Sequence, residues 1–152
     1  RNTKKIKKHH TLFVKFKKAV SNDINAPLLK QMIPTGTILK DVIIEKNVGK
    51  INFGRQMGSY PILVGVAAPI PIYSSIDVTV VDHGFRSLTA VPYPLNINTA
   101  NLNTLQTLPM IGEKRAMRLI RNRPFSSSTE ILPVFDDEKV GKQLIELIPF
   151  TT

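Results

Sequence analysis

Several absences narrow what this sequence encodes. Cysteine is missing from all 152 residues, which excludes disulfides, thiolate zinc sites and cysteine-ligated iron–sulfur clusters from this chain. No run of about 18 apolar residues occurs, so no segment is predicted to span a membrane as a helix. No secretory signal pattern opens the chain, because the basic start is followed by only a short mixed stretch. We therefore expect a cytoplasmic protein with no membrane partner.

What is present is enough to fold. Apolar residues make up 42% of the chain, which favours a packed core over disorder. The length suits one ordinary domain or two small ones. The chain does not begin with methionine, which suggests a piece of a longer protein.

Positive charge is concentrated in two places. The formal net charge is +10, and residues 1–18 contain eight Lys and Arg but no acid. Residues 95–125 hold a second cluster, opposed locally only by Glu113: Lys114, Arg115, Arg118, Arg121 and Arg123. Residues 126–152 are acidic. Two basic patches indicate a polyanionic partner, the alternative being a solvated tail and an ordinary soluble helix face.

The N-terminal region is predicted to be helical. Four apolar residues recur at helical spacing among lysines and predict a basic amphipathic helix over 9–22: Leu12, Phe13, Phe16 and Val20. Asn25 is the expected N-cap of a second helix over 26–33, which ends before Gly36.

The middle of the chain has the composition of β-strands. Val, Ile, Thr, Tyr and Phe dominate five short segments, at 37–46, 50–54, 60–67, 76–83 and 86–92. The residues Asn47–Gly49 and His83–Gly84 are typical of hairpin turns. Five short strands with no helix between them predict a small antiparallel barrel, with a meandering sandwich as the alternative.

Helical periodicity returns after Pro94. Asn98 or Thr99 is the expected cap of a helix over 99–107, and a second helix follows a tight turn at 113–122. A shorter helix near 129–132 and a last one ending near Ile148 form a looser copy of the same hairpin. The predicted fold is α+β, in three parts: a basic tail with N-terminal helices (1–34), a small barrel (35–93) and an all-α doubled helical hairpin (94–152).

The tight turn between the first two of these helices carries the main functional hypothesis. Gly112 is expected to take a positive φ or to allow close approach of another backbone. The first N–H groups of the next helix lack intrahelical partners and attract phosphate, and cations one turn later contact flanking phosphates. The predicted nucleic-acid-binding residues here are Met110, Gly112, Lys114, Arg115, Arg118 and Arg121. The alternative is an ordinary corner in a small bundle.

Residues 96–125, NINTANLNTLQTLPMIGEKRAMRLIRNRPF, resemble the helix-hairpin-helix DNA-binding motif. The sequence matches its IN-x-A start, its Leu-Pro and Ile-Gly pairs, and its x-Lys-x-Ala continuation. Met110 stands where the motif's first glycine is expected, so a positive φ there would be strained. The second copy lacks glycine at its turn and contains Asp136 and Asp137, so we interpret it as structural.

A wider resemblance covers most of the chain. PTGTILKDVIIEKNVGKINFGRQMGSYPILVGV and VDHGFRSLTAVPYPLNIN are similar to the C-terminal part of archaeal radical SAM proteins that end in a helix-hairpin-helix. This resemblance implies an upstream domain with a [4Fe–4S] cluster and S-adenosylmethionine, and no catalysis or cofactor in this chain. It also implies a barrel like the TRAM or OB modules, which bind RNA in related enzymes.

The barrel contains its own candidate site. Phe53–Tyr60 is predicted to be a glycine-flanked loop in which Arg55 and Gln56 contact nucleic acid, because small barrels bind single strands through basic loops and aromatic rings. His83, Phe85 and Arg86 mark another such turn. The alternative is that these glycines only form turns between strands and that the aromatic residues pack in the core.

Together these observations predict a non-catalytic module that binds DNA or RNA through the backbone, without sequence specificity. One alternative is a structural module that docks on the catalytic domain. Another is a free-standing OB-like and helix-hairpin-helix RNA-binding protein.

Overall fold

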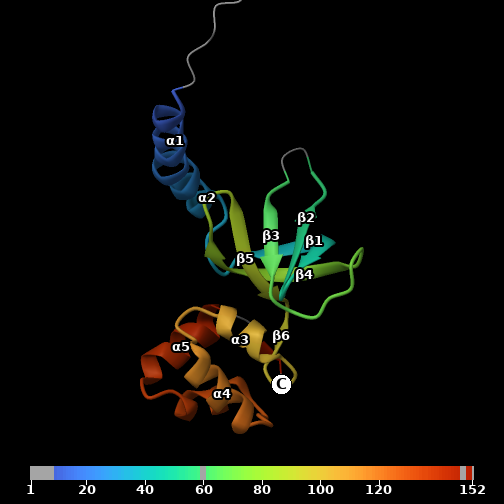
Figure 1. Cartoon of the computed structure of the whole chain (residues 1–152). Coiled ribbons are helices and arrows are strands. Elements are labelled where there is room, and N and C mark those ends of the chain that lie inside the picture. Colours follow the sequence, from blue (N-terminus) through green and yellow to red (C-terminus); the bar gives the residue numbers. More distant parts are fainter. Residues whose placement is uncertain (1–8, 59–60, 148–149, 152) are drawn as a thin grey trace, which may run out of the picture.

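The computed structural model describes residues 9–58, 61–147 and 150–151. It is an α+β fold with a closed five-stranded barrel at its centre (Figure 1). An N-terminal helix projects from one side of the barrel, and a unit of short helices lies below it (Figure 1). Among the described residues, no helix combines the length and the apolar character that crossing a bilayer requires.

The N-terminal helix is continuous, where a break had been predicted. A π-helical segment, η1 (Val20–Asn25), joins α1 (His10–Ala19) to α2 (Ala26–Met32). The prediction of Asn25 as an N-cap is wrong, because its backbone is helical and its side chain makes no capping hydrogen bond. The helix ends as expected before Gly36, which has a φ of 88° and donates its N–H to the Val80 carbonyl at 2.8 Å.

The barrel is built from β1 (Ile38–Val48), β2 (Ile51–Gln56), β3 (Leu63–Val66), β4 (Ser75–His83) and β5 (Ser87–Pro92). Its strand order is β1-β2-β3-β5-β4, closed by pairing of β4 with β1. The predicted closed barrel is confirmed, but not as a purely antiparallel one, since β3 pairs with β5 in parallel. The cause is the connection from β3 to β4, which crosses to the far side of β5 before the β4–β5 hairpin forms.

Alternating apolar residues of the strands fill the barrel. The fully buried set is Val42, Ile44, Val64, Val66, Val78, Val80 and Ala90, with Leu88 nearly so. Gly54 allows β1 and β2 to approach, because a Cβ there would lie 2.3 Å from the Ile43 carbonyl oxygen. Leu29 of α2 also packs into this core, so α2 covers one end of the barrel.

The helical unit contains α3 (Leu102–Thr107), α4 (Glu113–Arg121), the 3₁₀ segment η2 (Ser128–Val134) and α5 (Glu138–Leu147). The unit is not all-α as predicted, because β6 (Leu95–Asn96) pairs in parallel with β7 (Phe150–Thr151). This short sheet joins the two ends of the unit, a long-range pairing that helical periodicity does not reveal.

The helical unit and the barrel share buried contacts. Val81 and Val91 of the barrel belong to the apolar cluster that forms the core of the helical unit. The Thr104 hydroxyl of α3 donates to the Ala67 carbonyl just after β3. The boundary between residues 93 and 94 stays a prediction, and the packing holds the two sides together.

Candidate nucleic-acid interface

The turn between α3 and α4 is fixed by buried residues on each side of an exposed one. Leu108 and Ile111 are buried, and the Ile111 N–H donates to the Leu108 carbonyl at 3.1 Å. Met110 lies between them with a φ of 63° and 46% of its surface exposed. This left-handed conformation is uncommon for a residue with a long side chain. Arg115 donates from Nη1 to the Met110 carbonyl at 2.6 Å and stabilises the turn.

Gly112 is the N-cap of α4, and its conformation differs from the one expected. Its φ of −80° and ψ of 176° are extended backbone that any residue adopts, so the prediction of a positive φ at Gly112 is wrong. The expected close approach of another backbone is not seen among the described residues either, since a Cβ placed there would meet none of their atoms within 4 Å, its chain neighbours aside. The left-handed residue is Met110, because the chain reverses before Ile111 enters the core. Gly112 is therefore exposed, with room for a side chain.

The start of α4 has unused hydrogen-bond donors. The amides of Glu113, Lys114 and Arg115 donate to no acceptor among the residues described, as is usual for the first turn of a helix. These N–H groups point out of the N-terminal end of the helix, where the macrodipole is positive. The carboxylate of Glu113 stands beside them and opposes an anion.

The four predicted cations of α4 differ in availability. Lys114 and Arg121 are exposed, and neither has a hydrogen-bond or ion-pair partner in the described part of the chain. Arg115 is committed to the turn, as above. Arg118 donates from Nη1 to Asp136 Oδ1 at 2.7 Å, in an ion pair with both side chains largely exposed. Exposed pairs of this kind are weak, so Arg118 is held only loosely.

Arg123, the fifth cation of the basic cluster, faces inward. Its Nη2 donates to the Ala100 carbonyl at 2.5 Å, and burial lowers the pKa of its guanidinium. Its Nε is buried with no partner among the described residues. Arg123 therefore links the end of α4 to the segment before α3.

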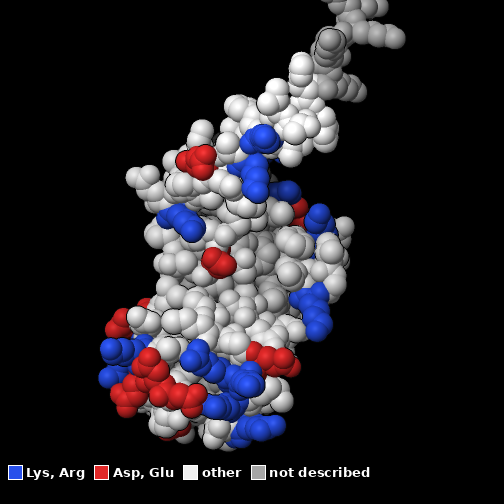
Figure 2. Space-filling model, turned by 60° about the vertical axis from the view of Figure 1, so that its left-hand side comes forward, with Lys and Arg blue, Asp and Glu red and all other residues white. Residues whose placement is uncertain are grey.

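A shallow cavity of about 610 Å³ lies beside the turn. It is lined by residues 106–112 and, on the barrel side, by Val81 and Asp82 at the end of β4. Figure 2 shows Lys and Arg side chains gathered over the helical unit, at the bottom of the view, with Asp and Glu beside them. The surface is thus cationic in places and mixed in others, and of the predicted cations of α4 Lys114 and Arg121 are the available ones.

Arg55 and Gln56 lie in β2, not in the loop where the sequence placed them. Arg55 pairs with Glu45 at 2.6 Å, and the Gln56 side-chain amide donates to the Lys40 carbonyl at 2.7 Å. Pairing of β1 with β2 extends through Gln56, so the loop starts later than predicted. Ser59 and Tyr60, also placed in that loop, lie outside the described residues. The cavity beside the α3–α4 turn is lined by β4, so the structure does not bring the two predicted sites together there.

Asn98 has a role that the sequence did not reveal. The expected N-cap of α3 is instead Asn101, whose Oδ1 accepts from the Thr104 N–H at 2.8 Å. The Asn98 side chain accepts from the Phe125 N–H at 2.8 Å and donates to the Phe125 carbonyl at 2.9 Å. This double bridge fixes the end of α4 against the start of the helical unit. Partners 27 residues apart leave no local pattern.

The described residues contain no group of three or more His, Asp or Glu side chains placed to hold a metal ion. Comparison with known proteins found two archaeal relatives. The chain is 39% identical over 129 residues to an uncharacterized protein of Archaeoglobus fulgidus, a match that covers 84% of this chain and 23% of that protein. It is 45% identical over 91 residues to an uncharacterized protein of Methanocaldococcus jannaschii, covering 59% of this chain and 17% of that protein.

The chain thus spans less than a quarter of the length of these curated relatives. No protein-family model matches the sequence. No solved structure matches it either.

Proposed function

We propose that this chain is a non-catalytic nucleic-acid-binding module that holds the phosphate backbone at the start of α4. The observation that carries the proposal is the left-handed Met110. It shapes a turn after which Gly112 is exposed and the first amides of α4 have no acceptor among the described residues. Amide donors at a helix N-terminus suit a phosphate, and Lys114, the second residue of α4, adds a positive charge beside them.

Met110 also bears on the resemblance to the helix-hairpin-helix motif. It occupies the position of the motif's first glycine and has the positive φ that a glycine adopts easily. A positive φ at this position supports the resemblance, at some cost in strain. This supports a hairpin that still binds phosphate, because the ligand contacts proposed here come from backbone amides and not from the side chain of residue 110.

The barrel supports the same class of function. Small five-stranded barrels of Greek-key topology include the OB folds, which bind oligonucleotides. The order β1-β2-β3-β5-β4 with a parallel β3–β5 pair is such an arrangement. A phosphate site beside the barrel would extend a surface of this kind.

A titration with three nucleic acids tests the proposal. Fluorescence anisotropy with single-stranded RNA, single-stranded DNA and duplex DNA at about 50 and 200 mM salt should show affinity that falls steeply with salt, since phosphate contacts release counterions. The variant Lys114→Glu/Arg121→Glu should lose at least tenfold in affinity. The control Lys139→Glu/Lys142→Glu makes the same change in net charge on α5 and should lose much less. Equal losses would show that only total charge matters and would overturn the proposed site.

From the resemblance we infer that this module follows a radical SAM domain in a longer polypeptide. The relatives support a longer protein, since each is more than four times the length of its match to this chain. A [4Fe–4S] cluster would belong to that upstream domain, because this chain has no cysteine to ligate it. Catalysis would likewise belong there, and this module would deliver or hold the nucleic acid.

A second function is favoured by the N-terminal helix. No residue of α1 is buried, and Phe13 and Phe16 are 62% and 67% exposed. Apolar residues continue along one row of the helix through η1 and α2, at Ile24, Leu28 and Met32. A row of exposed apolar side chains beside lysines indicates a docking surface for another part of the longer protein. If docking is the sole function, none of the three nucleic acids binds at 200 mM salt in the titration above.

A further inference from the structure

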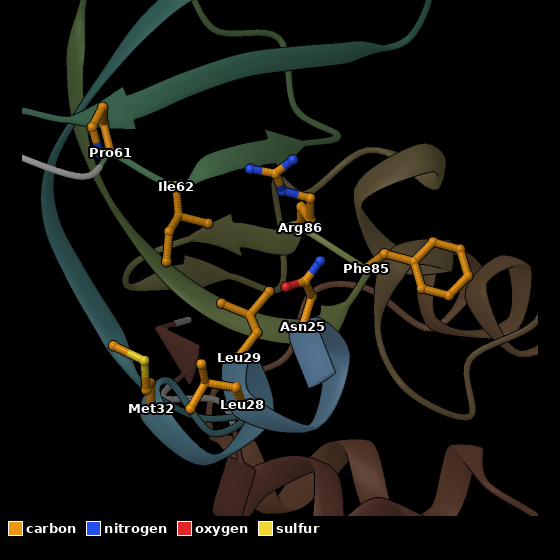
Figure 3. Close-up of a pocket in the computed structure, with 8 residues that line it drawn as sticks. All are labelled: Asn25, Leu28, Leu29, Met32, Pro61, Ile62, Phe85 and Arg86. Carbon is orange, nitrogen blue, oxygen red and sulfur yellow. The ribbon is translucent and has the colours of Figure 1, made fainter. Parts of the chain in front are cut away.

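A separate cavity lies at the end of the barrel that α2 covers. Its volume is about 330 Å³, and it lies between α2, the start of β3 and the turn from β4 to β5. Figure 3 shows Leu28 and Leu29 of α2 on one side and Ile62 on the other, with Asn25 and Arg86 near them. The cavity therefore has apolar walls and two polar side chains, an amide and a guanidinium.

The wall that Arg86 belongs to is held in place. The ring of His83 makes a hydrogen bond of 2.6 Å between its Nε2 and the carbonyl of Ile33, just after α2. Within the turn, the Gly84 N–H donates to the Ser87 carbonyl at 2.8 Å. A Cβ on Gly84 would lie only 2.6 Å from the Ser87 Oγ, so the turn is tight as well. The cavity is thus formed before any ligand arrives.

An aromatic ring stands at the outer edge of the cavity. Phe85 is 58% exposed, and Figure 3 shows its ring directed away from Ile62 and Arg86. A ring that is exposed in a tight turn contributes little to the core. It offers a flat surface on which a base can stack.

The same strand end reaches both this cavity and the α3–α4 turn. Asp82, which lines the cavity beside Met110, is only three residues before Phe85. Three residues span at most about 10 Å between Cα atoms, so one short strand of nucleic acid is long enough to reach both places. Duplex DNA cannot insert a paired base into a cavity of this kind, whereas a single strand can turn a base outward.

We propose that the cavity between α2 and the β4–β5 turn binds one unpaired nucleobase, with the next base stacked on Phe85. The proposal rests on the proposed nucleic-acid function and adds a preference for single strands. A base has two flat, largely apolar faces, which suit Leu28 and Ile62, and a polar edge. The Asn25 amide has both a donor and an acceptor for that edge.

The test compares single-stranded and duplex ligands of the same sequence. Phe85→Leu removes the ring and keeps an apolar side chain, and Asn25→Ala removes the amide at a helical position that alanine favours. Each should lower affinity for single-stranded RNA or DNA about tenfold and leave duplex affinity within twofold. Phe13→Leu, which changes an equally exposed ring on α1, is the control and should leave both affinities unchanged. In the parent chain, single strands containing 2-aminopurine should gain fluorescence on binding, because the base that enters the cavity leaves the stack of its neighbours, and Asn25→Ala and Phe85→Leu should reduce the gain.

Two results would overturn the inference. One is equal loss of single-strand and duplex affinity in Phe85→Leu and Asn25→Ala, and the other is no loss in either variant. If Lys114→Glu/Arg121→Glu still abolishes binding while these variants bind normally, the phosphate site stands and the base site fails. If the pocket variants lose single-strand binding and the α4 variant does not, the base site stands and the phosphate site fails.

Discussion

The two halves of the helical unit have the same order of elements, but the charges at the start of their longer helices are of opposite sign. Each has a short helical segment, a turn and a longer helix: α3 with α4, and η2 with α5. In the first half, the start of α4 is open and followed by cations. In the second half, Asp136, Asp137 and Glu138 precede or begin α5, and Asp137 accepts from the Lys139 N–H at 2.9 Å. The first amides of α4 thus have no acceptor among the described residues, whereas an amide in the first turn of α5 donates to a carboxylate.

The difference shows that a short helical segment, a turn and a longer helix do not by themselves form an anion site. The second half contributes to packing through Ile131 and Leu144, which are fully buried, and through Gly141. Its Asp136 also neutralises Arg118 of the first half. The second half therefore supports the fold and pairs with a cation of α4, while the first half leaves Gly112 exposed.

Replacing Gly141 and Gly112 by serine, one at a time, should show most strongly that the second half supports packing and the first half does not depend on it. A Cβ on Gly141 would lie 2.8 Å from Leu132 Cδ2 and 3.0 Å from Phe135 Cδ2, and a serine would also bury a hydroxyl there. Gly141→Ser should lower the free energy of unfolding by about 2 kcal/mol. Gly112→Ser should change it by only a few tenths of a kcal/mol, because the site is open and serine is a good N-cap. Thermal and urea unfolding measure both, and equal destabilisation would contradict the comparison.

Making α4 resemble α5 should remove binding without harming the fold. Gly112→Asp places a carboxylate at the N-cap, where it can accept from the free amides and interact with the helix dipole. We expect unchanged or slightly higher thermal stability and at least a tenfold loss of affinity for all three nucleic acids, since the carboxylate occupies the phosphate position. Gly112→Ser, which adds no charge, should lose less. Undiminished affinity of Gly112→Asp would show that phosphate binds elsewhere.

Local patterns were sufficient to predict the elements of the barrel. The five strands lie close to their predicted segments, because alternation and hairpin residues such as those at 47–49 act within a few positions of each other. The parallel pairing of β3 with β5 could not be predicted in this way. It depends on where the connection between β3 and β4 crosses the barrel, and the sequence of that connection does not specify its path.

The candidate site was predictable in position but not in detail. The spacing around Leu108 and Gly112 located the turn and the helix that follows it. The partners of the cations were not predictable, since Arg118 pairs with a residue 18 positions later and Arg55 with one 10 positions earlier. The apolar face of α1 was predicted from its period, but the period does not say whether the face is covered. It is exposed in this chain.

The smallest expected effect concerns the ion pair that connects the two halves. Asp136→Asn removes the carboxylate that holds Arg118, so Arg118 becomes available to a phosphate beside Lys114 and Arg121. Because exposed pairs are worth at most about 1 kcal/mol, we expect a two- to threefold gain in affinity, about 0.5 kcal/mol. Asp137→Asn makes the same change in net charge on a residue that caps α5 and does not pair with Arg118. Anisotropy titrations at about 50 mM salt compare the two, and equal gains would show that net charge, not the release of Arg118, sets the affinity.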